Sequence, residues 1–81
     1  MYEAELPAAI LRALAPWGRL PESDLVQRLS PVLAAHLRPT VFLELARQGL
    51  IEVQVVGDER VLTLTEQGRR ALAERAPAHD L

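Results

Sequence analysis

The sequence contains no cysteine, no lysine and no asparagine, and it has one tryptophan, one tyrosine and one phenylalanine. Without cysteine the chain can form neither a disulfide nor a thiolate metal site. Its apolar runs are short and interrupted, so no transmembrane helix is expected, and we find no signal-peptide pattern. We therefore expect a cytoplasmic protein that contacts no membrane and holds no metal or cofactor.

The length and composition predict one small domain spanning residues 1–81, because 49% of the residues are hydrophobic and the chain is long enough for a single core. We expect residues 1–4 and 77–81 to be flexible. Nine arginines and eleven acidic residues give a formal net charge of -2. Domains that bind nucleic acid are more often basic, so this balance counts mildly against such a function. The abundance of alanine, leucine and arginine is typical of a prokaryotic protein encoded by a gene of high GC content.

The most informative pattern lies within residues 45–72. Gly49 follows a helical stretch and is expected to end that helix with a positive φ angle. Residues 51–55 alternate between apolar and polar side chains, as in a half-buried strand with Ile51, Val53 and Val55 on its buried side. Residues 57–60 supply a turn, and residues 61–64 form a returning strand with Leu62 and Leu64 on one face. This order predicts a helix followed by a β-hairpin.

A second helix is expected directly after the hairpin, with Thr65 as its N-cap. The hairpin and the motif Leu64-Thr65-x-x-Gly68-Arg69-x-x-Leu72 that follows it resemble the wing and the last helix of winged-helix regulators of the PadR and MarR families. The resemblance covers about the last half of the chain.

This resemblance implies a mainly helical α+β fold, with a three-helix core, a β-hairpin wing and a short C-terminal helix. It also implies a prokaryotic transcriptional regulator that binds double-stranded DNA, with the helix before the hairpin in the major groove. Winged helices also serve as protein-docking modules, so the fold does not fix the function.

The remaining elements follow from helical periodicity and from the positions of proline and glycine. Trp17 is interpreted as a core residue under the end of the first helix, in preference to a stacking or docking residue. The apolar stripe of that helix comprises Leu6, Ile10, Ala13 and Leu14. Leu11 lies off this stripe and is a candidate for a contact surface. We predict helices over residues 5–15, 21–29, 39–48 and 66–76, a strand at 19–20 and a helical turn at 32–37.

Projection of residues 39–48 at 100° per residue buries Phe42 and Leu45 and leaves the opposite face outward. Hydroxyl, amide and guanidinium groups on that face can bond to base edges or phosphates. The candidate DNA-binding residues are Arg38, Thr40, Leu43, Glu44, Arg47 and Gln48, together with Arg60 of the hairpin.

Two features oppose DNA binding. Glu44 lies three residues before Arg47, where it can pair with the arginine and repel phosphate, and Asp58 and Glu59 outnumber Arg60 at the hairpin. The alternative is therefore a winged-helix interaction module or accessory subunit that does not bind DNA directly. Its candidate surface comprises Leu11, Leu43, Asp58 and Glu59, and a homodimer through the first helix, the last helix or these leucines is a further possibility.

Catalysis is not expected. The sequence has no glycine-rich phosphate loop, no nucleophile elbow and no metal-ligand spacing. Glu22 and Asp24 could form a pair of catalytic carboxylates, but acidic residues in the first turn of a helix are explained more simply by the helix dipole.

Overall fold

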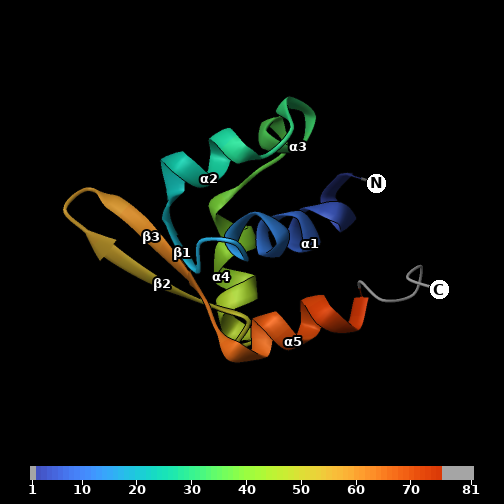
Figure 1. Ribbon diagram of the computed structural model, residues 1–81. Coiled ribbons are helices and arrows are strands. Elements are labelled where there is room, and N and C mark those ends of the chain that lie inside the picture. Colours follow the sequence, from blue (N-terminus) through green and yellow to red (C-terminus); the bar gives the residue numbers. More distant parts are fainter. Residues whose placement is uncertain (1, 76–81) are drawn as a thin grey trace.

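The computed structural model describes residues 2–75 and has a mainly helical α+β architecture (Figure 1). This confirms the coarse prediction of a mainly helical α+β class. One short helix more is present than the resemblance implies, because the predicted turn near residue 32 is a separate helix. The elements in order are α1 (Tyr2–Leu14), β1 (Arg19–Pro21), α2 (Glu22–Arg28), α3 (Pro31–Ala35), α4 (Pro39–Arg47), β2 (Ile51–Val56), β3 (Glu59–Leu64) and α5 (Glu66–Arg75).

The helices begin and end close to the predicted residues, with one exception. We predicted that the first helix starts at residue 5, but α1 begins at Tyr2, so that Pro7 lies inside the helix. Met1 and residues 76–81, which include the predicted flexible end at 77–81, lie outside the described residues. None of the helices within residues 2–75 is long and apolar enough to cross a membrane.

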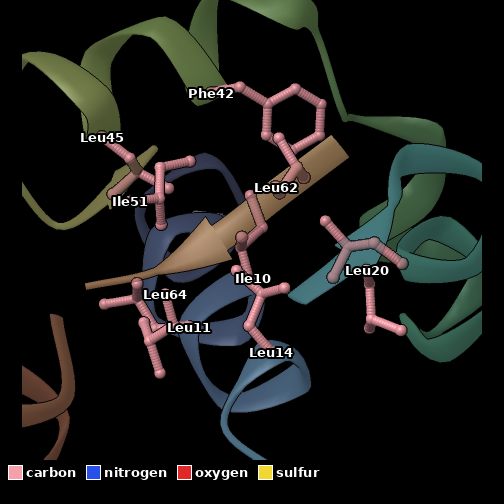
Figure 2. Close-up of a cluster of buried hydrophobic side chains, with 10 residues drawn as sticks. Ile10, Leu11, Leu14, Leu20, Phe42, Leu45, Ile51, Leu62 and Leu64 are labelled. Carbon is pink, nitrogen blue, oxygen red and sulfur yellow. The ribbon is translucent and has the colours of Figure 1, made fainter. Parts of the chain in front are cut away.

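Helix α1 lies at the centre of the molecule, between α2 and α3 on one side and α5 on the other (Figure 1). Leu6, Ile10 and Leu14 are fully buried, as the helical stripe predicts. Leu11 is also buried, with 2% of its surface exposed, in the cluster drawn in Figure 2. The expectation that Leu11 belongs to a contact surface is therefore wrong, because α5 packs against α1 and widens the buried stripe.

Trp17 is 59% exposed, so its interpretation as a core residue is also wrong. The backbone N–H groups of Trp17 and Gly18 both donate to the Leu14 carbonyl, at 3.0 and 2.7 Å, and this tight turn ends α1. The Trp17 ring is directed outward, where the Arg28 guanidinium lies 4.8 Å from its centroid in a cation–π contact.

The three strands form an antiparallel sheet in the order β1-β3-β2. Strand β1 pairs with β3 through Leu20 and Leu62, which confirms the predicted third strand. Leu62 and Leu64 are buried on one face, as predicted. The far half of the hairpin extends beyond the helices, and Val55, which was expected on the buried side, is consequently 72% exposed (Figure 1).

Helix α5 approaches the end of α4 so closely that only glycine fits at residue 68. Gly68 is buried, and a Cβ atom there would overlap the Leu50 carbonyl oxygen and lie 2.7 Å from Leu64 Cδ1. The overlapping atom belongs to the backbone, so relief requires a movement of the chain and not of a side chain.

We predict that Gly68→Ala lowers the free energy of unfolding by about 2 kcal/mol or more, since overpacking against backbone is poorly relieved. Gly57→Ala is the comparison variant, because its added methyl meets no atom within 4 Å and only its φ of +63° costs stability, by about 1 kcal/mol. Urea denaturation of both variants measures which of them loses more unfolding free energy. Equal stability of the two variants would contradict the close approach.

Candidate nucleic-acid interface

Helix α4 forms the centre of the candidate site, and its sequence defines both of its ends. Pro39 occupies the first turn, where its missing N–H is not needed, and Arg38 is the N-cap with an extended backbone and no side-chain capping bond. Phe42 and Leu45 are buried beneath the helix. Gly49 has a φ of +80°, which confirms the predicted left-handed end of the helix.

The C-terminal end of α4 is held by Thr65, which lies between the hairpin and α5. The Thr65 hydroxyl is 2.7 Å from the Gly49 carbonyl oxygen and 2.9 Å from that of Leu50, and it accepts a 3.0 Å bond from the Gly68 N–H. The Thr65 N–H also donates to Leu50 O, at 3.1 Å. These bonds confirm the N-cap prediction and connect the end of α4 to both neighbouring elements.

The outward face of α4 is exposed as the periodicity predicts. Leu43 is 60% exposed at its centre. An open cleft of about 310 Å³ lies beside this face, with Pro7 of α1 and Leu45 among its lining residues. The other exposed residues of the predicted set are Arg38, Thr40, Glu44, Arg47 and Gln48.

Arg47 and Glu44 are paired, as expected from their spacing, with 3.5 Å between Nη1 and Oε1. Both side chains are well exposed, so the pair contributes little to stability and opens at low cost. The arginine is therefore reachable by a phosphate, although its charge is partly cancelled. Together with Arg38, the outward face has two positive charges and one negative charge.

Arg60 does not join α4 but contacts α2. Its Nε atom donates to Glu22 Oε1 at 2.9 Å, and both side chains are partly buried. Glu59 accepts a 3.1 Å hydrogen bond from the Ser23 N–H. The hairpin is thus bonded to the start of α2, and an open cleft of about 550 Å³, lined in part by Val26 and Val55, lies between them.

Sequence reasoning missed this contact between the hairpin and α2. Its members are separated by 36 and 38 residues, so no local pattern reports it. The register of β1 with β3 would have indicated it, because Pro21 lies opposite Val61 and so brings the next residue, Glu22, near Arg60. Glu22 therefore has a structural partner, and Asp58 remains exposed at the tip.

The candidate residues do not form one site. Those of α4 share one exposed face, whereas Arg60 and Glu59 face α2 and Leu11 lies in the core. Within residues 2–75, no group of three or more histidine, aspartate or glutamate side chains could hold a metal ion. No family model, curated protein or solved structure matches the chain, so its function has to be inferred from its own geometry.

Hydrogen bonds donated by the Ser23 side chain and backbone N–H hold the pKa of the Glu59 carboxyl below its ordinary value of 4.5. A lowered pKa in the folded state means that the ionised carboxylate stabilises the fold above about pH 4.5. This stabilisation disappears as the pH falls through the lower, folded-state value.

We predict that Glu59→Gln lowers the melting temperature at pH 7, and that its difference from the natural chain narrows at pH 3. Asp58→Asn is the control, because no described group bonds to the Asp58 side chain. Thermal unfolding at the two pH values measures both differences. A Glu59→Gln difference that is the same at pH 7 and pH 3 would contradict the bond to Ser23.

Proposed function

We propose that this chain is a winged-helix domain that binds double-stranded DNA through α4, weakly as a single copy, and acts in transcriptional regulation. The observation that supports the proposal is the single exposed face of α4, on which Thr40, Arg47 and Gln48 are accessible together. These side chains are suited to base edges and phosphates. The β2–β3 hairpin follows α4 in the chain, as the wing does in the families that the sequence resembles.

The N-terminal end of α4 adds to this support. No side chain caps its first turn, and Arg38 lies at the N-cap. The positive end of the helix dipole and a guanidinium at the same place favour an anion such as a DNA phosphate. Arg38 would contact the backbone at one end of α4 and Arg47 at the other.

The charges limit the strength of this binding. Arg60 is held by Glu22, and Arg28 is stacked on Trp17, so neither adds to the α4 face. Two phosphate contacts remain, from Arg38 and Arg47. Each releases about 0.9 counterion on B-DNA, so the slope of log K against log salt is expected to be about -2 per protomer.

We predict opposite effects for two substitutions on α4. Glu44→Gln removes a repulsion and releases Arg47, which should tighten binding to a duplex of arbitrary sequence about twofold to fivefold. Arg47→Ala should weaken binding by a similar factor and make the salt slope shallower by about one. Fluorescence anisotropy at several salt concentrations between roughly 20 and 200 mM measures the duplex affinity and its salt slope, because screening changes strongly over this range.

Arg60→Ala is the matched control. It removes the same charge from the chain but from a side chain bonded to Glu22, so duplex affinity should be nearly unchanged. Equal losses for Arg47→Ala and Arg60→Ala would indicate a response to net charge and not to the α4 face. No binding by the folded protein at the lowest salt would refute the proposal.

A second candidate function is protein docking through the same helix. It is favoured by Leu43, which is 60% exposed at the middle of the face beside the cleft lined by Pro7. An exposed leucine flanked by a neutralised arginine and glutamate fits a mixed apolar and polar partner surface better than a phosphate backbone. Absence of duplex binding at low salt, with the fold intact by circular dichroism, would favour this function.

A further inference from the structure

The outer edge of the sheet is formed by β2, since the strand order is β1-β3-β2. Every residue from Ile51 to Val56 has a partner on β3 without interruption, so the edge is regular and has no bulge. Within residues 2–75, no hydrogen bond from outside the sheet reaches residues 52–56. In Figure 1 the far half of the hairpin projects beyond the helices, and no element lies along the outer edge of β2 there.

The direction of the free backbone groups follows from one bond on the opposite side. The Leu64 N–H donates to Gly18 O, so the backbone groups of Leu64 point toward β1. Because the direction alternates along a strand, the N–H and C=O groups of residues 59, 61 and 63 point toward β2 instead. Their partners on β2 are Val56, Gln54 and Glu52. The N–H and C=O groups of Val53 and Val55 therefore point outward, without a partner strand.

The two edges of the sheet differ in how they are protected. Strand β1 is three residues long and ends in proline, and both features prevent the addition of another strand. Strand β2 has six residues, with no proline or lysine and one charged side chain, Glu52. Val55 and Val56 are 72% and 55% exposed. A long, regular and apolar edge of this kind is a template for strand pairing.

We propose that β2 pairs antiparallel with β2 of a second copy of this chain, about a twofold axis at Gln54. In this register Val53 of one protomer lies opposite Val55 of its partner, and both residues exchange their outward N–H and C=O groups. Val53 and Val55 then pair with each other across the two strands, which is a favourable cross-strand arrangement for β-branched residues.

The charge on the edge is compatible with a second copy. Glu52 lies opposite Val56, and the two Glu52 side chains are four residues apart along the strands, which is about 13 Å. This separation exceeds the Debye length of about 8 Å at physiological salt, so their repulsion is largely screened. An interface made by one strand edge is small, below about 1,200 Å² in total, and we therefore expect a weak and reversible dimer. This proposal does not depend on DNA binding, because it uses none of the α4 residues.

Amide hydrogen exchange of the full chain at low and high protein concentration tests the pairing residue by residue. Exchange at Val53 and Val55 should slow several-fold as the concentration rises from micromolar to millimolar. Exchange at Gln54, whose N–H is already bonded to β3, should not follow the dimer fraction. Sedimentation equilibrium over the same range should detect dimers. A chain that stays monomeric at millimolar concentration, or protection that rises only outside β2, would overturn the proposal.

Val55→Pro provides the sharpest variant, because it removes an outward N–H and leaves the bonds to β3 in place. Its dimer association constant should fall at least tenfold, whereas Val55→Thr, which keeps both the N–H and the branched shape, should stay within about threefold. Val55→Lys keeps the backbone intact and should also dissociate the dimer if the proline variant does not fold. Unchanged dimerisation in both Val55→Pro and Val55→Lys would refute pairing through β2.

Discussion

The position of α4 depends on the contacts at Thr65 and Gly68. One hydroxyl group reaches the last carbonyl groups after α4 and accepts the Gly68 N–H, while the missing side chain of Gly68 lets α5 lie directly on Leu50 O. Gln67 adds a 3.2 Å bond from its side-chain amide to Gln48 O. The end of α4, the base of the hairpin and the start of α5 are therefore fixed relative to one another, and the outward face of α4 has a defined direction.

A second set of contacts positions the far part of the hairpin. The pair of Arg60 with Glu22 and the bond from Ser23 to Glu59 hold β3 against the start of α2. The same contacts occupy Arg60, the arginine that could have extended a basic surface along the hairpin, so it adds no free positive charge to Arg38 and Arg47 on the α4 face. The structure thus combines a well-supported helix with a nearly neutral surface, which is why the proposed DNA contact is weak for one protomer. Pairing through β2 would place two such helices in one assembly.

Local patterns were sufficient to predict most of the fold. Three predictions depend on interactions within a few residues, and the structure confirms each of them. They are the positive φ of Gly49, the N-cap at Thr65 and the burial of Leu62 and Leu64 on one face. Leu11 was assigned wrongly because its burial depends on a distant element, α5, which packs against α1. Trp17 was assigned wrongly because the tight turn after Leu14 directs its ring outward. The exposed face of α4 was predictable from helical periodicity, whereas the partners of Glu59 and Arg60 required the register of β1 with β3.

The most direct test of α4 as a binding surface is a titration of the isotope-labelled chain with a short DNA duplex at low salt, followed by amide chemical shifts. Binding through this helix predicts that the largest shifts cluster at Arg38, Thr40, Leu43, Arg47 and Gln48, while residues of the core and of the hairpin contact with α2 change little. Shifts that are largest elsewhere in the chain, or no shifts at a saturating excess of duplex, would contradict the assignment of α4 as the nucleic-acid interface.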